Sequence, residues 1–318
     1  ATNELFNVIH GFHGSRSLRD LIMNHPVVLS FEITSNREKG VRFLVQVESR
    51  HAESLKQTVV AYLPQIKVES IDPPRSEAYR VVEFKQSGHY AFPLSAVDSL
   101  DQNDPVAYLT SAMTNLEPDE SIHVQLVLEP VRINEALLLA RRILGNEDLL
   151  RRLNSNKLPF WDKFIDIINS AFMGTADLFG EMIATTPSSK KSYYGHDRNN
   201  YDKIQVQKHQ KPARTLSTFE QELMQTMHNK LNQPLFRVNL RVAVKMNDSV
   251  NVKQRFTAIK TSLNAYSVPS YQTLKVRLTI PVLERVKLQA FTNRAPSFRT
   301  KQTLTLASSE LASLYHFP

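Results

Sequence analysis

Cysteine is absent from the 318 residues of this chain. Its absence excludes disulfide bonds, thiolate nucleophiles and zinc sites with cysteine ligands, and it is typical of a reducing compartment. Glycine is scarce, with only eight residues, and neither GxxxxGK[ST] nor GxGxxG can be drawn from them. Because a phosphate-holding loop needs such glycines, the sequence predicts that this chain does not hydrolyse nucleotides by itself.

Long uncharged hydrophobic runs are also missing. The most apolar region, residues 160–183, is not predicted to cross a bilayer because five charged residues interrupt it: Asp162, Lys163, Asp166, Asp177 and Glu181. We expect a buried contact between helices there, with a helix lying on a membrane surface as the alternative. The first residues, ATNELFNVIHGF, lack the pattern of a signal peptide. A cytoplasmic location is therefore expected.

Charge is distributed unevenly along the chain. The net charge is +8, but residues 1–185 carry 18 Lys and Arg against 24 Asp and Glu, whereas residues 186–318 carry 21 against 7. This difference predicts an acidic partner for the C-terminal part, with nucleic acid as the commonest candidate and an acidic protein or anionic lipid as alternatives. A solvated basic surface without a partner is the other interpretation.

The first part of the chain has the pattern of strands that alternate with helices. Period-two runs predict a hairpin over 27–33 and 40–48, and helical spacing over 51–63 is followed by another apolar alternation. The further elements expected here are a strand over 66–71, a strand over 78–84, a helix over 105–116 and a strand over 122–128.

The last part of the chain repeats the order of strand, helix and strand. Helices are predicted over 215–231 and 252–266, and strands over 235–245 and 271–280. The fold class expected is α+β, with mostly antiparallel sheets built from ferredoxin-like β-α-β units. The predicted organisation is a first α+β unit (1–130), a helical segment (131–185), a linker (186–214) and a second, basic α+β unit (215–318).

Basic side chains gather on one face of the strand over 235–245. Arg237, Arg241 and Lys245 share that face, and Lys275 and Arg277 share a face of the strand over 271–280. If the two strands are neighbours, the sheet has a cationic surface that could hold the phosphates of DNA. The alternative is a basic face that is solvated or docks against an acidic neighbouring domain.

Residues that could bind a metal ion or act in catalysis form only weak patterns. His10 and His13 lie three apart and could share a metal ion, but ordinary histidines are the preferred interpretation. An unrecognised metal-dependent hydrolase or nuclease using Asp101, Asp104 and Glu129 is a third hypothesis for the function. No cofactor and no metal ion are predicted.

One strand carries residue types that resemble a nucleophile and its base. Ser121, His123, Gln125 and Glu129 lie on one face of the stretch ESIHVQLVLE. Successive side chains on that face are about 7 Å apart, so their spacing does not predict direct hydrogen bonds. We interpret them as the polar face of a sheet.

Several segments resemble a known family when they are taken together in order. They are SFEITSNREKGVRFLVQVE, AYLPQIKVESID, IHVQLVLEPV, TFEQELMQTMHNKL, LFRVNLRVAV and the ending SSELASLYHFP. They resemble the region before the motor domain of type IV secretion ATPases and DNA-transfer coupling proteins, in the form found in Gram-positive and related bacteria. In that family a Leu-Tyr or Leu-Phe, His-Phe-Pro sequence comes just before the nucleotide-binding core.

The resemblance implies a cytoplasmic region, tethered to the inner face of the membrane by segments outside this chain. The partners that it implies are the chain's own downstream ATPase domain, secretion-channel or membrane proteins, DNA, and further copies in a hexamer. No catalytic residue is carried over, because the Walker motifs have no matching positions. The leading hypothesis is therefore a non-catalytic assembly and docking region, and the alternative is a DNA-binding module that uses the basic C-terminal half.

Overall fold

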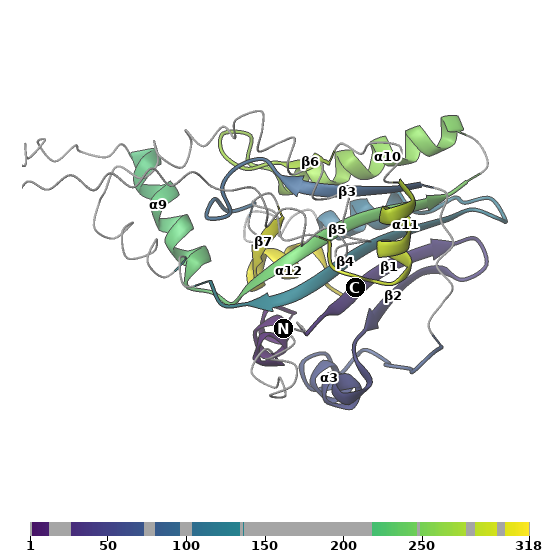
Figure 1. Cartoon of the computed structure of the whole chain (residues 1–318), viewed down its shortest axis with the longest axis horizontal. Helices are drawn as coiled ribbons and strands as arrows, with labels where there is room; N and C mark the ends of the chain where they lie inside the picture. Colours follow the sequence, from purple (N-terminus) through teal and green to yellow (C-terminus); the bar gives the residue numbers. More distant parts are fainter. Residues whose placement is uncertain are drawn as a thin grey trace, which may run out of the picture.

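The computed structural model describes residues 2–12, 27–72, 80–95, 104–133, 136, 218–246, 249–277, 284–297 and 303–317. These residues form one seven-stranded sheet with helices packed around it (Figure 1). Every pairing among the described strands is antiparallel, so the expected α+β class is confirmed. The predicted linker, and all but the first few residues of the predicted helical segment, lie outside these ranges.

The bounds of the elements agree with most of the sequence predictions. The strands are β1 (Leu29–Asn36), β2 (Gly40–Gln46), β3 (Arg80–Gln86), β4 (Ser121–Val131), β5 (Leu235–Lys245), β6 (Leu274–Val276) and β7 (Leu304–Ala307). The helices are α1 (Thr2–His10), α3 (Ser49–Tyr62), α4 (Pro105–Ser111), α9 (Thr218–Leu231), α10 (Ser249–Leu263), α11 (Glu284–Thr292) and α12 (Ser308–Leu314), with a 3-10 turn at Asn264–Tyr266. The strand predicted over 66–71 does not form, and α11 and β7 were not predicted.

The strand order joins the two predicted α+β units into one sheet. The order is β2-β1-β4-β5-β3-β6, with β7 paired to β5. β4 and β5 pair from Ser121↔Lys245 to Val131↔Leu235, and β3 lies between β5 and β6 (Figure 1). The expectation of separate ferredoxin-like sheets is therefore wrong. β4 and β5 are buried on both faces, and a doubly buried strand needs a partner on each side to satisfy its backbone.

The hairpin between β1 and β2 follows from its turn residues. Gly40 has a φ of +61°, a left-handed conformation that glycine adopts without a steric cost. The Lys39 backbone N–H donates to Asn36 Oδ1 at 2.8 Å, which closes the turn. This turn fixes the register between the two strands, with Thr34 opposite Arg42.

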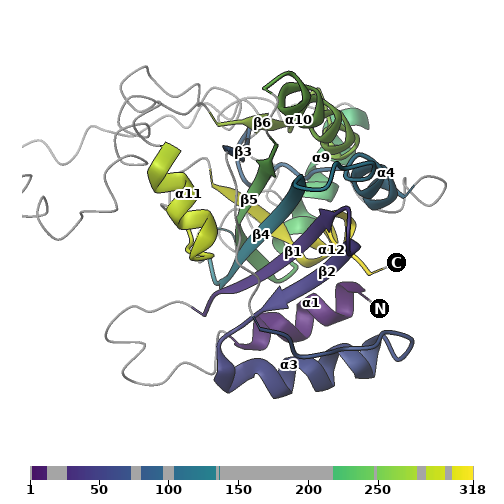
Figure 2. The ribbon, with the colours of Figure 1, turned by 90° about the vertical axis from the view of Figure 1, so that its right-hand side faces the viewer.

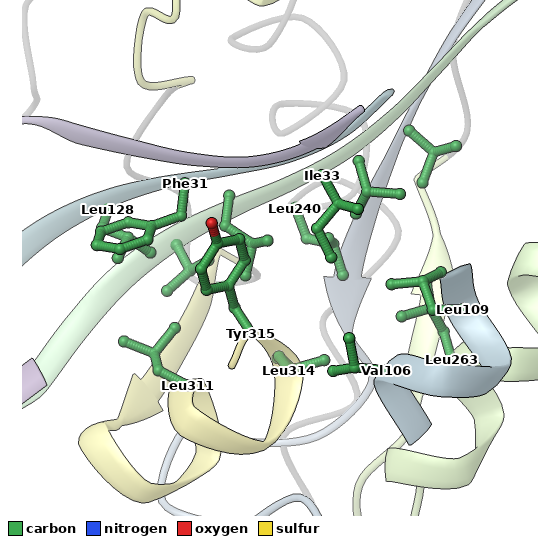
Figure 3. Packing of buried hydrophobic residues seen from close by; sticks show 14 of the residues in the cluster. Phe31, Ile33, Val106, Leu109, Leu128, Leu240, Leu263, Leu311, Leu314 and Tyr315 are labelled. Atoms are coloured by element: carbon green, nitrogen blue, oxygen red, sulfur yellow. The ribbon is translucent and has the colours of Figure 1, made fainter. Parts of the chain in front are cut away.

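One face of the sheet is apolar and is covered by helices. Figure 2 shows α1, α3, α4, α10 and α12 on this side. Figure 3 shows the strand residues Phe31 and Leu240 in one cluster of buried side chains with Leu109 of α4, Leu263 of α10 and Leu314 of α12. Alternation along each strand places these apolar side chains on the same face, so burial of this face builds the main core.

The other face of the sheet has a different cover. In Figure 2, α11 lies on the side of the sheet opposite to α4 and α10. α9 packs at the far end of β4 and β5, where Met227 and Leu231 meet Val131 and Leu235. No helix within the described ranges is both long and apolar enough to cross a membrane.

Candidate functional site

The face of the sheet beneath α11 carries a row of polar side chains that crosses four strands. Glu32 is opposite Gln125, Gln125 is opposite Arg241, and Arg241 is opposite Glu83. Directly paired residues of antiparallel strands point to the same face. These four residues, which we call the central polar row, are only 2%, 0%, 1% and 4% exposed. Charged side chains this deeply buried need partners, so their contacts indicate what the row does.

Arg241 caps the C-terminal end of α11. Its Nη1 donates to Gln125 Oε1 at 3.2 Å and to the Ala290 carbonyl at 3.1 Å. Its Nη2 donates to the Ala295 carbonyl and to Ser297 Oγ, both at 2.7 Å. The last carbonyls of a helix lack partners within the helix and carry its partial negative charge. The guanidinium therefore satisfies the acceptors at which α11 ends.

Gln125 and Glu32 continue these contacts toward β1. Gln125 Nε2 donates to Glu32 Oε1 and to the Phe291 carbonyl, each at 3.1 Å. Glu32 also accepts from Ser30 Oγ at 2.8 Å, from Arg294 Nε at 2.7 Å and from Arg294 Nη2 at 3.2 Å. The two-pronged pairing with Arg294 is a strong form of ion pair, and it ties the turn after α11 to the sheet.

Glu83 anchors the opposite end of the row. Its Oε1 accepts from Asn239 Nδ2 at 2.9 Å, and Asn239 Oδ1 accepts from the Ser297 backbone N–H at 2.9 Å. Arg277 Nη1 lies 3.8 Å from Glu83 Oε2, and the backbone N–H of Arg277 donates to the Glu83 carbonyl at 2.8 Å. Residues 294–297 are thus held at both ends of the central polar row.

Burial shifts the pKa values of basic groups on this face. The pKa of Lys287 on α11 is lowered to about 8, mainly by burial and further by Arg277 and Arg241, while Glu83 opposes the shift. The pKa of His123 is lowered, also mainly by burial, with Glu32 acting in the opposite direction. Desolvation disfavours the charged form of both side chains, so near neutral pH His123 is an uncharged imidazole.

Three of the predicted phosphate-binding residues face carboxylates of the sheet. Arg241 and Arg277 are buried around Glu83. Arg237 has a side chain 33% exposed, and its Nη1 lies 3.8 Å from Oε2 of Glu129. The pattern of β5 alone could not predict these neighbouring carboxylates, because Glu83 and Glu129 come from the strands on either side of β5. On this face the cationic surface expected from the sequence is largely neutralised.

The other two predicted residues lie away from the central polar row. Lys245 is half-buried at the end of β5. Lys275 is exposed on β6, where it pairs in register with Lys85. The structure therefore does not bring the five residues together as one open surface, and DNA binding through them stays a prediction.

The histidines considered for metal binding do not form a visible site. His10 Nε2 lies 3.2 Å from the Val131 carbonyl, and its ring meets Phe236 edge to face at 5.4 Å. His13 lies outside the described residues. Within those residues no group of three His, Asp or Glu side chains is placed to hold a metal ion.

The acids considered for hydrolysis make structural contacts. Asp104 Oδ1 accepts from the Val106 backbone N–H at 2.8 Å, which caps α4, and it lies 3.1 Å from His316 Nε2. Glu129 faces Arg237, while Asp101 falls outside the described ranges. Nor do Ser121, His123 and Gln125 act together, because Gln125 bonds to Glu32 and the ring of His123 packs edge-on against Phe291.

A second buried ion pair lies at the junction of α9 and α12, and sequence reasoning missed it. Lys230 Nζ is 3.0 Å from Glu310 Oε2 and donates to the Phe92 carbonyl at 3.1 Å. Glu310 also accepts from the backbone N–H groups of Leu94 and Ala307, each at 2.7 Å. Burial lowers the pKa of Lys230, and Glu310 opposes this shift. These contacts hold Phe92, Leu94 and Lys230, which lie far apart in the sequence, beside α12.

Comparison with known proteins identifies a family for the whole chain. A family model described as "Domain of unknown function (DUF8128)" matches residues 2–318. No curated protein and no solved structure matches the chain. The match includes the strands of the central polar row and the segment around α12.

Proposed function

We propose that this chain, which belongs to the DUF8128 family of domains of unknown function, is a non-catalytic assembly and docking region of a conjugation-type DNA-transfer ATPase. In this proposal it lies on the cytoplasmic side of the membrane, is tethered there by segments outside this chain, and positions the copies of a hexameric motor. The ordered resemblance of its segments, ending in Leu314-Tyr315-His316-Phe317-Pro318, is the first support.

The packing of that ending is the observation that carries the proposal. Tyr315 is 0% exposed, and its ring meets Phe31 at 5.1 Å and Phe43 at 5.6 Å, both edge to face. Phe317 continues the cluster, with its ring 6.0 Å from Phe43 and 5.3 Å from Tyr315. A domain joined directly after Phe317 would therefore be connected at a point that is packed against the sheet. Such a rigid joint suits a region that positions a motor.

The ion pair between Lys230 and Glu310 strengthens the same joint. It fixes α12 to α9 and to the backbone at Phe92 and Leu94. Breaking a buried pair by removing one partner costs about 3–5 kcal/mol, so α12 is hard to detach. The joint would transmit displacement of a neighbouring domain to the whole sheet.

The experiment that tests the proposal is to read the coding sequence after Pro318 for GxxxxGK[ST] at a strand-to-helix turn. We expect this motif, and we expect the full-length protein to form hexamers when its mass is measured in solution with nucleotide. A stop codon, or a following domain without the motif, would overturn the proposal. A motif in a protein that stays monomeric would overturn the assembly role.

A second candidate function is direct contact with DNA, and the positive charge of α10 and of the residues after it favours this function. No Asp or Glu occurs between Asp248 and Glu284, and Lys253, Lys260 and Lys275 are exposed in that stretch. A surface of this kind would hold phosphates by charge alone, and its affinity would fall steeply between about 50 and 200 mM salt.

Fluorescence anisotropy with labelled DNA tests this candidate. We expect the double variant Lys253→Glu and Lys260→Glu to lose affinity. The matched control, Lys39→Glu with Lys56→Glu, reverses two exposed lysines in the acidic half of the chain and should retain it. Equal losses in both variants, or affinity that does not change with salt, would exclude a specific role for α10.

A further inference from the structure

A second row of polar side chains lies beside the central polar row, on the same face of the sheet. Thr34 of β1 is opposite Arg42 of β2 on one side and opposite His123 of β4 on the other. Thr34, Arg42 and His123 lie two positions along their strands from Glu32, Leu44 and Gln125, respectively. Residues two apart in a strand share a face. We call Thr34, Arg42 and His123 the outer polar row.

The outer polar row, unlike the central one, is not satisfied. Arg42 Nε, Thr34 Oγ1 and His123 Nδ1 are all buried, and the described part of the chain offers none of these three atoms a hydrogen-bond partner. Leaving one buried polar group without a partner costs about 1–3 kcal/mol, and native structures contain few such groups. Three of them on adjacent strands mark a place where a bound acceptor group would be stabilised.

The carboxylate of Glu32 does not bind the outer polar row. Glu32 is the neighbour of Thr34 on this face, but its oxygens already accept from Ser30, Gln125 and both prongs of Arg294. Releasing Glu32 toward the outer polar row would leave Arg294 and Gln125 without their acceptor. A group that binds the outer polar row must therefore come from elsewhere.

The chemistry of the three atoms defines what that group must be. Arg42 Nε–H can only donate, and Thr34 and His123 can each donate as well. The positive charges of Arg294 and Arg42 both act on His123 and help to lower its pKa. A ligand with two or more acceptor positions and a negative charge matches this set better than water, which brings no charge. Phe291 packs edge-on against His123 and offers an apolar wall for carbon atoms attached to the charged group.

We propose that Arg42, Thr34 and His123 form a binding site for a carboxylate group. One carboxylate oxygen accepts from Arg42 and the other from Thr34 and His123, in the charge-assisted manner of strong hydrogen bonds. Arg42 and His123 are partly exposed and Thr34 at the centre is 3% exposed, while the three binding atoms are themselves buried, so the side chains above them must shift to admit the carboxylate. The proposal does not depend on the function proposed above.

The carboxylate could belong to a free organic acid or to an acidic side chain, and two probes distinguish these sources. Acetate represents the free acid, and the α-amide of N-acetylglutamic acid represents a glutamate side chain. Each is titrated into the intact chain at constant ionic strength with chloride as the reference, while the ring signals of His123 are followed by NMR.

Binding of either probe should raise the pKa of His123, because a negative charge beside it favours its protonated form. A response to both probes supports a site for acidic side chains, and a response to acetate alone supports a site for free small acids. If neither probe shifts the His123 signals beyond the effect of chloride, the proposal is overturned.

Variants give a second and independent readout. Thr34→Val keeps the shape of the side chain and removes the central hydroxyl, so the acetate affinity should fall about tenfold or more, as for one lost hydrogen bond to a charged group. Arg42→Gln should abolish binding. Arg37→Gln is the matched control, since Arg37 lies exposed in the same hairpin, and it should bind acetate like the unmodified chain.

Thr34→Ser keeps the hydroxyl and controls for folding. If the three polar atoms bind no ligand and only destabilise the fold, Thr34→Val instead raises the free energy of unfolding and leaves the acetate titration unchanged. That result would also overturn the proposal.

Discussion

The face of the sheet that meets α4, α10 and α12 is lined by Leu, Ile, Val and Phe side chains, whereas the face beneath α11 is lined by Glu, Gln, Arg and Asn. The first face belongs to one continuous core that extends from α1 to α12. On the second, the apolar cluster found at α11 among the described residues consists of Phe291 and Leu288 with Ala243 and Val81. The same strands therefore present two different kinds of packing.

This difference teaches how each layer is specified. Apolar contacts are not directional, so the helices on the first face are held by how much surface they bury. Buried hydrogen bonds require defined atoms at defined distances, so α11 is held in one position by Arg241, Gln125 and Glu32. We therefore expect the apolar face to supply most of the stability. On the polar face, we expect the binding of α11 to the sheet to depend on the charges of the side chains beneath it.

The largest effect is expected from a change in the apolar face. Phe31 is fully buried, with its ring 5.2 Å from Phe6 and 5.1 Å from Tyr315. Phe31→Ala should lower the free energy of unfolding by about 3–5 kcal/mol, because a buried phenyl ring is lost and a cavity remains. Urea denaturation at low and high salt should give the same loss. Phe219→Ala, at an exposed position on α9, should change it by less than about 0.5 kcal/mol.

Removal of the Arg241 guanidinium tests the polar face. Arg241→Met leaves the acceptors at Ala290, Ala295 and Ser297 without a donor and leaves Glu83 with one cation fewer, so we expect a loss of about 3 kcal/mol. Hydrogen exchange should become faster in residues 284–297 and stay slow in β1. Arg241→Lys should not restore protection, because one ammonium cannot reach acceptors arranged for a planar fork. Protection that survives in Arg241→Met would show that α11 is held by its apolar contacts.

Titration of Lys287 gives a smaller effect whose direction is fixed. Its pKa is about 8 in the folded chain, against 10.5 for an ordinary lysine. Between these values the unfolded chain binds a proton that the folded chain does not, so the stability contributed at Lys287 rises as the pH rises. Relative to Lys287→Met, the intact chain should gain about 1–3 kcal/mol from pH 8 to 10.5.

Chemical denaturation across this pH range measures that gain, with Lys260→Met on the solvent face of α10 as the control. The control should show no comparable gain. A gain of equal size in the control would mean that the pH dependence is not specific to the cover of the polar face.

The local pattern of the sequence predicts the elements of the apolar face well. The alternation in β5 predicts its bounds as observed, 235–245, because the period of two continues over eleven residues. α11 and β7 escaped prediction because nine and four residues are too short to establish a period.

The central polar row could not be predicted because it depends on strand order. Gln125 and Arg241 were both recognised as facing residues of strands, but they were assigned to separate units. Their pairing, and that of Arg241 with Glu83, joins positions far apart in sequence. A usable signal was nevertheless present, since β3 and β4, the strands on either side of β5, each carry a glutamate within an apolar alternation. Acidic positions of this kind predict buried pairing with the basic strand β5.

The smallest effect is expected from an ion pair that belongs to neither face. Arg37 Nη1 lies 3.4 Å from Glu117 Oε2, and the two side chains are 59% and 75% exposed. Water screens such a pair, so Glu117→Gln should lower the free energy of unfolding by about 0.2–0.5 kcal/mol at low salt, with no measurable loss at high salt. The comparison with Arg241→Met depends on this contrast, because both variants remove a charged partner and differ mainly in burial. If Glu117→Gln cost as much as Arg241→Met, burial would not be the reason that the polar face is strong.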